Sequence, residues 1–192
     1  FKEALREVKI AEQLATEKKS LMFIYNLLGA ILDITGDTEQ ALQQHHRALM
    51  LSREVGDADI EAAELNNIAT IYKDQNNLDK ALEYYEKAIN IWNSDAKKSA
   101  TYGNIAMIYT AKGDNKKAEE YLKLSIKLDE KSGNYHGLAI NLLNLGNVYR
   151  KMGLYEISQT TLDLGLDKIK RVKDSYWEAY AYQYIGRLYR DR

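Results

Sequence analysis

Apolar side chains recur along this chain with the spacing of helices that bury one face. Small residues stand at five anchor positions, and large apolar residues or tyrosines lie four residues before, one before and three after each anchor. The anchors are Gly29, Ala69, Ala106, Gly146 and Gly186. This spacing of i, i+3, i+4 and i+7 is typical of a helix with one buried stripe. The chain therefore carries five copies of one predicted helix, named helix A.

A second amphipathic stripe, named helix B, begins twelve residues after each of the first four anchors. Two further columns of small residues, seven positions apart, run through these stripes and through the start of the chain. The first column holds Ala4, Ala41, Ala81, Ala118 and Ser158, and the second holds Ala11, Ala48, Ala88, Ser125 and Gly165. Small side chains let two helix backbones approach closely, while large neighbours fill the remaining gaps. We predict that each helix A packs against its helix B.

The segments between helices A and B predict tight turns. Gly36, Asn76, Gly113 and Gly153 fall where helix A is expected to end in the left-handed conformation that glycine and asparagine tolerate. Asp37, Asn77 and Asp114 follow as expected N-caps of helix B. The alternative reading of "GDTEQAL" as a phosphate-binding loop lacks the fuller glycine-rich fingerprint and a preceding strand.

These columns resemble the tetratricopeptide repeat. "LNLGNVY" (143–149) and "KALEYYEKA" (80–88) match its pattern closely, whereas the closing proline is absent and the anchors are 37 or 40 residues apart instead of 34. The longer repeat is similar to those of bacterial signalling regulators, sensor kinases and kinesin light chains. HEAT and armadillo repeats share the period, but the small-residue columns and the capped turn argue against them.

The predicted fold is all-α: an α-solenoid of antiparallel helix pairs, about ten helices in all, without strands. A single array would span residues 1–192. Its parts are a helix B at 1–17, repeats at 20–55, 57–93, 96–132 and 134–173, and a helix A or cap at 174–192. Because the array begins and stops within a repeat, we expect the natural protein to continue on one or both sides.

Composition narrows the chemistry. The chain has no cysteine and a net charge of −1, so disulfides and thiolate metal sites are excluded and nucleic acid is not an expected partner. The basic segment 168–173 is interpreted as the cationic end of a helix. The most apolar stretch, 21–32, is too short to span a bilayer. The expected molecule is soluble, with its compartment left open.

No catalytic motif is evident. His45 occupies a helix B column held elsewhere by Tyr85 and Leu122, which indicates a packed core residue. His46 is its expected exposed neighbour, and His136 falls in a predicted inter-repeat loop. No metal-binding motif or activated nucleophile appears. We expect a non-enzyme without metal or cofactor.

The side of helix A opposite its core stripe is the most informative surface. By resemblance to the family, it lines the concave face of the solenoid. Asn67, Asn104 and Asn144 recur there in register. Because an amide both donates and accepts hydrogen bonds, such a row can hold an extended peptide backbone. The competing interpretation makes these residues polar fillers between helices.

The ends of this surface differ in character. Phe23 and Leu27 make the first helix A apolar all round, so it must be covered by further repeats, by a second copy or by an apolar ligand group. At the other end lie residue types that anchor interfaces. The remaining candidate groove residues are Asn147, Lys73, Arg150, Lys151, Tyr180, Tyr184 and Arg187, with Arg190 beside them.

The predicted function is therefore a protein- or peptide-binding scaffold, part of a larger protein. The alternative is a sensor or regulatory segment of a bacterial histidine kinase or transcriptional regulator, in which a ligand changes the curvature of the array. A homodimer through the terminal helices is a further expectation. Neither nucleic-acid binding nor membrane insertion of this segment is expected.

Overall fold

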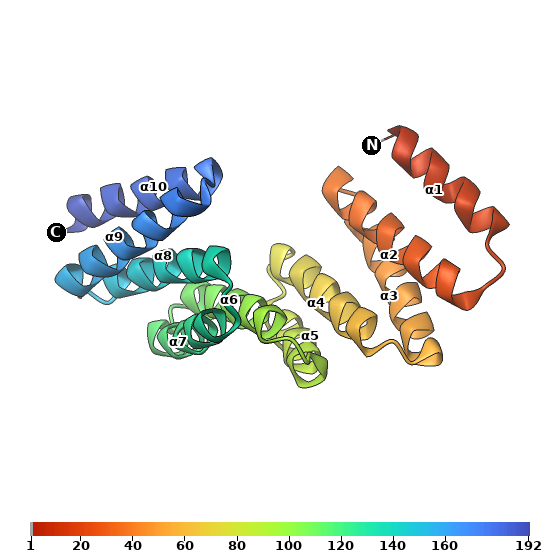
Figure 1. Ribbon diagram of the computed structural model, residues 1–192, viewed down its shortest axis with the longest axis horizontal. Coiled ribbons are helices and arrows are strands. Elements are labelled where there is room, and N and C mark those ends of the chain that lie inside the picture. The colour runs from red at the N-terminus through yellow and green to blue at the C-terminus, as the bar shows by residue number, and fades with distance from the viewer. Residues whose placement is uncertain (1) are drawn as a thin grey trace. The chain divides into compact units, whose positions relative to one another are not determined.

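The computed structural model describes residues 2–192, which form ten helices and no strand (Figure 1). Their bounds are α1 (Lys2–Leu14), α2 (Lys18–Thr35), α3 (Thr38–Val55), α4 (Ala58–Asp74), α5 (Leu78–Ile91), α6 (Asp95–Lys112), α7 (Asn115–Ser132), α8 (Tyr135–Lys151), α9 (Tyr155–Val172) and α10 (Ser175–Asp191). The even-numbered helices are the predicted A helices and the odd-numbered ones the B helices. The all-α prediction and its number of helices are confirmed.

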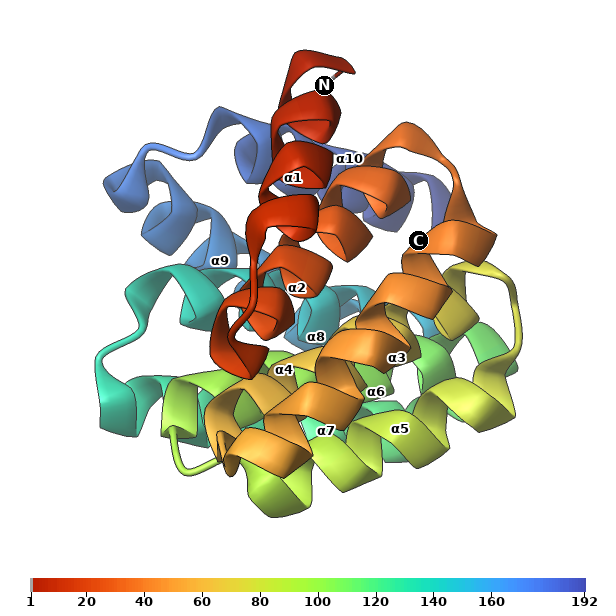
Figure 2. The ribbon, with the colours of Figure 1, turned by 90° about the vertical axis from the view of Figure 1, so that its right-hand side faces the viewer.

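The chain divides into two compact units, Phe1–Trp92 (unit 1) and Asn93–Arg192 (unit 2). In unit 1, α2 packs along α3 and α4 along α5, and α3 joins the two pairs (Figure 2). In unit 2, α6 pairs with α7 and α8 with α9, while α10 packs on both α8 and α9 (Figure 1). Helix α6 also contacts α8, so the three A helices of unit 2 are neighbours.

Close approach of the paired helices explains the small-residue columns. A Cβ added at Gly146 would lie 2.6 Å from Leu162 Cγ, and one at Gly29 would lie 2.7 Å from the His45 ring. Ala69, Ala106 and the column residues of α3, α5 and α7 are fully buried. Ala4, Ala11 and Gly186 are exposed instead, because no helix within residues 2–192 packs on those faces of α1 and α10.

The predicted turn conformations are confirmed. Gly36, Asn76, Gly113 and Gly153 have φ values of 86°, 59°, 79° and 75°. Asp37 and Asp114 accept hydrogen bonds from the backbone N–H groups of Gln40 and Lys117. Asn77 is the N-cap of α5 as predicted, but its side chain does not make the expected capping hydrogen bond. Helix α5 starts on the backbone bond from Ala81 N to the Asn77 carbonyl at 3.1 Å.

One histidine lies elsewhere than predicted. His136 is in the first turn of α8 and not in a loop, because Asn134 accepts the Gly137 N–H and starts the helix at Tyr135. No helix in the described part of the chain combines the length and the apolar character needed to cross a membrane.

Candidate peptide-binding groove

Residues of α6, α8 and α10, with Leu122 of α7, line two adjoining pockets in unit 2, together named the unit 2 groove. The first, named the apolar pocket, has a volume of about 320 Å³; the second, named the amine pocket, has about 200 Å³. Met107 and Asn144 line both. The apolar pocket is also lined by Ala100, Gly103, Asn104, Asn134, His136, Gly137, Ile140, Asn141 and Trp177, and the amine pocket by Thr110, Ala111, Leu122, Asn147, Lys151 and Tyr184.

Three amides of the groove have hydrogen-bonding capacity left for a ligand. Asn104 is half-buried and makes no hydrogen bond through its side chain to any described residue. Asn144 is 9 % exposed and accepts one weak hydrogen bond, from the Tyr184 hydroxyl at 3.4 Å. Asn147 accepts from Arg150 Nε at 3.2 Å. Because each amide has two donor hydrogens and an acceptor oxygen, all three retain unused donors.

A fourth amide, Asn141, has a structural role. Its Nδ2 donates to Asp129 Oδ2 at 2.8 Å and to Ser99 Oγ at 3.5 Å. Ser99 Oγ in turn lies 2.8 Å from Ser125 Oγ. This buried network satisfies its members and joins α6, α7 and α8. Asn141 therefore uses its donors to hold helices together, whereas Asn144 and Asn147 keep unused donors in the groove.

The amine pocket end of the groove carries excess positive charge. Lys151 Nζ donates to the Thr110 carbonyl at 3.2 Å. Partial burial lowers the pKa of Lys151, and the neighbouring charges of Arg150 and Arg187 lower it further. Arg150 is held by an ion pair with Asp191, whereas Arg187 has no ion-pair partner among residues 2–192. Three cations thus lie near one another with a single carboxylate to balance them.

Aromatic rings follow the groove side of α10. Trp177 and Tyr180 have ring centroids 5.3 Å apart, and those of Tyr180 and Tyr184 are 6.3 Å apart in an edge-to-face arrangement. Burial raises the pKa of the Tyr184 hydroxyl, which is the group that contacts Asn144. The rings supply large apolar area with polar tips, as interface residues commonly do.

The structure brings together the candidate residues of α6, α8 and α10. Asn104, Asn144, Asn147, Lys151 and Tyr184 line the pockets directly. Tyr180 contacts their aromatic border, Arg187 acts electrostatically on Lys151, and Arg150 contacts Asn147.

Four of the predicted groove residues belong to unit 1 and do not line the unit 2 groove. Asn67 is half-buried on α4, with no side-chain hydrogen bond to the described residues. Lys73 pairs with its neighbour Asp74 at 3.4 Å. Phe23 and Leu27 are 46 % and 48 % exposed on α2. The unit 2 groove is therefore built without them.

Trp177 and His136 line the apolar pocket but were missed as groove residues. Trp177 precedes Tyr180 by three positions, which places both on one face of α10. Its position there and its residue type could have identified it. His136 could be found only once the start of α8 at Tyr135 was known. Its Nε2 lies 2.8 Å from Asp174 Oδ2.

A buried polar cluster in unit 1 was also missed. His45 is buried as predicted, but its Nδ1 lies 2.6 Å from Glu64 Oε2. The Asn26 amide donates to the other oxygen of the same carboxylate. Glu64 has no exposed surface. The cluster joins α2, α3 and α4.

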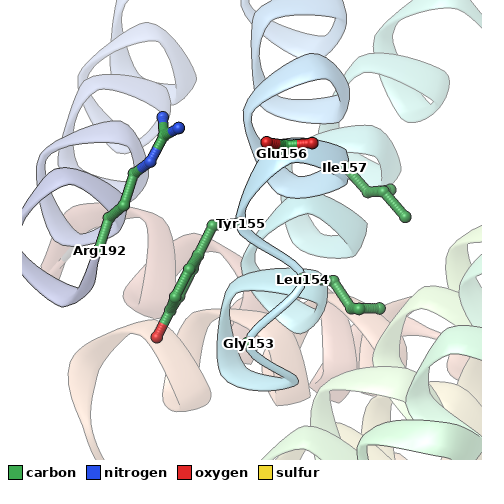
Figure 3. A pocket seen from close by; sticks show the side chains of 6 residues that line it. All are labelled: Gly153, Leu154, Tyr155, Glu156, Ile157 and Arg192. Atoms are coloured by element: carbon green, nitrogen blue, oxygen red, sulfur yellow. The ribbon is translucent and has the colours of Figure 1, made fainter.

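A third pocket, of about 390 Å³, lies at the turn between α8 and α9. Figure 3 shows Leu154 and Ile157 on one side of this turn, and Tyr155 and Arg192 on the other. Its polar groups do not converge on one point, so it is a weaker candidate than the groove. No group of three or more histidine, aspartate or glutamate side chains in residues 2–192 is arranged to hold a metal ion.

The family model described as tetratricopeptide repeat matches residues 20–94, 59–131 and 97–164. The chain belongs to the tetratricopeptide repeat family. It is 27 % identical over 128 residues to the photosystem I assembly protein Ycf3 of Rippkaea orientalis, which covers 67 % of this chain and 70 % of that protein. The Ycf3 of Cyanophora paradoxa is 25 % identical over 149 residues, covering 78 % and 83 %.

Solved structures share the fold at low identity. A Rap protein complexed with competence and sporulation factor has a TM-score of 0.81 at 16 % identity, covering 94 % of this chain and 50 % of its own. The apo quorum sensor NprR of B. thuringiensis has 0.79 at 22 %, covering 96 % and 51 %. Kinesin light chain repeats of Podosopora anserina have 0.68 at 16 %, covering 88 % and 85 %. This chain spans about half the length of the Rap and NprR chains.

Proposed function

We propose that this chain is a non-enzymatic binding module whose unit 2 groove receives an extended peptide or protein segment. The observation that carries the proposal is the convergence of Asn104, Asn144 and Asn147 on two adjoining pockets with apolar and aromatic walls. A groove with unused amide donors beside apolar surface suits a peptide, because the amides bind the backbone while the pockets receive side chains.

The expected affinity is moderate. A neutral hydrogen bond contributes about 0.5–1.5 kcal/mol net, and ordering a flexible segment opposes binding. Micromolar dissociation constants therefore suit this groove better than nanomolar ones.

The experiment starts from a displayed library of random peptides selected on the immobilised chain. The affinity of a selected peptide is then measured by fluorescence anisotropy. Asn104→Ala with Asn144→Ala should weaken it roughly 5- to 100-fold, since two hydrogen bonds are lost. Asn90→Ala, an exposed substitution on α5, serves as the control and should change nothing. Unchanged affinity of the double variant, with its helical circular dichroism intact, would refute the proposal.

A second candidate function is a sensor segment of a signalling protein. The observation favouring it is the likeness to the Rap protein solved with a bound factor and to the NprR quorum sensor. In that case the groove would bind its ligand in the same way, and binding would control an attached output domain. A kinase, DNA-binding or membrane-spanning segment in the flanking gene sequence would favour this function over a simple scaffold.

A further inference from the structure

The unit 2 groove is chemically different at its two ends, and this difference restricts what it can bind. The walls of the apolar pocket include Ala100, Met107, Ile140 and Trp177. The amine pocket has Lys151 in its lining, with Arg187 close enough to lower the pKa of that amine. No carboxylate lines either pocket in the described part of the chain.

We infer that the bound segment carries a large apolar side chain in the apolar pocket and, about three residues along, an acidic side chain facing Lys151 and Arg187. The inference rests on the proposed peptide-binding function and names the class of segment that this groove selects.

The charges near the amine pocket support an acidic side chain at that position of the bound segment. Asp191 is engaged by Arg150 and lies 3.5 Å from Arg190 Nε, so it is not available to Lys151 or Arg187. Asp174, near the other end of the groove, contacts His136. A ligand carboxylate would relieve the repulsion among Arg150, Lys151 and Arg187 and would gain charge-assisted hydrogen bonds.

The walls of the apolar pocket support the large apolar position. Trp177 offers an aromatic face, and Met107 offers a flexible, polarisable side chain that adapts to the ring or chain placed against it. Asn104 and Asn144 lie within the same pocket and can hold the backbone on either side of that residue.

Helix geometry sets the spacing. The linings follow α8 in order, with Gly137, Ile140, Asn141 and Asn144 in the apolar pocket and Asn144, Asn147 and Lys151 in the amine pocket. The middles of the two sets are about seven residues apart, or about 10 Å at 1.5 Å per residue. An extended segment covers that distance in about three residues.

The acidic group is assigned to a side chain within the segment. Lys151 and Ala111, which border the amine pocket, are both exposed, so the segment can continue past them. A ligand that ended in the amine pocket would need no such opening.

The test is a charge swap. A random ten-residue library, displayed with fixed residues after it so that no free carboxyl terminus is present, is selected on the chain and on Lys151→Glu with Arg187→Glu. Lys116→Glu with Lys127→Glu, two exposed positions of α7, is the matched control because it changes the net charge equally. Thermal unfolding followed by circular dichroism checks that each variant is folded.

On the parent chain and on the control variant, the selected peptides should be enriched in a large apolar residue. They should also carry Asp or Glu about three residues before or after it. On the swapped variant the acidic preference should change to Lys or Arg while the apolar preference remains. For one selected peptide, Glu→Gln should weaken binding to the parent about 3- to 10-fold and should not weaken binding to the swapped variant.

Three outcomes overturn the inference. Amide-dependent peptides without an acidic preference would leave the proposed function standing and remove this refinement. An acidic preference that survives the Lys151 and Arg187 swap, or that disappears in the Lys116 and Lys127 control, would indicate that peptides are selected by nonspecific charge attraction and not by the amine pocket. If no selected peptide depends on Asn104 and Asn144, the proposed function itself fails.

Discussion

Gly146 and Gly186 occupy the same column of the repeat but differ in what surrounds them. A Cβ at Gly146 would lie 2.6 Å from Leu162 Cγ and 3.2 Å from Leu162 N, whereas one at Gly186 would meet nothing within 4 Å. Replacing a mid-helix glycine by alanine gains about 0.5–1 kcal/mol of helix propensity at either position. Only at Gly146 does the added methyl force α8 and α9 apart.

We therefore expect opposite effects from the same substitution. Gly146→Ala should lower the free energy of unfolding by about 1–2 kcal/mol because overpacking outweighs the propensity gain. Gly186→Ala should leave it unchanged or raise it by up to about 1 kcal/mol. Urea unfolding followed by circular dichroism measures both. Equal effects of the two substitutions would contradict the close approach of α8 and α9.

The buried pair of His45 and Glu64 offers a second comparison at the residue scale. Removing one member of a buried, hydrogen-bonded pair typically costs about 1–3 kcal/mol, since the other polar group stays buried without a partner. His45→Leu and Glu64→Ala should each be destabilising by about that amount. The replacements come from equivalent repeat positions, Leu122 for His45 and Ala181 for Glu64.

The double variant should cost far less than the sum of the two single ones. It removes both polar groups together, and Leu162 already packs over the glycine of its own repeat as a leucine at position 45 would pack over Gly29. A double-mutant cycle in urea gives the coupling energy directly. Additive costs would show that the contact between the imidazole and the carboxylate contributes nothing.

At the scale of the element, the helix ends show which capping side chains contribute to stability. Asp114 accepts the Lys117 N–H at 3.1 Å, whereas Asn77 holds the equivalent position before α5 without a side-chain bond. Asp114→Ala should therefore cost about 0.5–2 kcal/mol. Asn77→Ala should cost less than about 0.5 kcal/mol. Thermal unfolding of the two variants tests the difference, and a larger loss for Asn77→Ala would contradict it.

The helices and their turns could be predicted from the sequence because they depend on local rules. Three features recur in the repeats: the period of the apolar stripe, the left-handed residue at the turn and the small residues where helices cross. Because the pattern is seen in several copies, a departure in one copy does not hide it. Gly36 and Gly113 have the conformations that this reasoning required. Asn77 is the N-cap of α5 as expected but lacks the side-chain hydrogen bond, since a residue type favours such a bond without ensuring it.

The polar interior could not be predicted in the same way. Glu64 stands in a column with Ile24, Thr101, Asn141 and Ala181, so the repeat gives no consistent residue type there. Its burial depends on His45 and Asn26, which reach it from two other helices. For the groove, the stripe on helix A identified Asn104 and Asn144, but the contribution of Trp177 depended on how α10 packs against α8.

At the scale of the whole molecule, stability should be divided between the two units. Unit 1 has core clusters of its own, among them one with Leu65, Ile68 and Trp92. Unit 2 likewise has a cluster with Leu122 and Leu145 and another with Leu143 and Leu162. In an array of repeats, stability is close to a sum of the repeats and their nearest-neighbour contacts. Damage at one point should therefore remain largely local.

Hydrogen exchange on Gly146→Ala tests this division. The substitution lies in unit 2, so amides of α8 and α9 should lose protection by about the factor that corresponds to the measured loss of stability, roughly tenfold for each 1.4 kcal/mol. Amides of α3 and α4 in unit 1 should change by less than about twofold, because the core cluster that contains Leu49 and Leu65 is made of unit 1 residues. Gly186→Ala provides the control in which neither unit loses protection. An equal loss in both units would mean that they unfold together, and a ligand bound in the unit 2 groove would then protect the entire chain instead of the helices that line it.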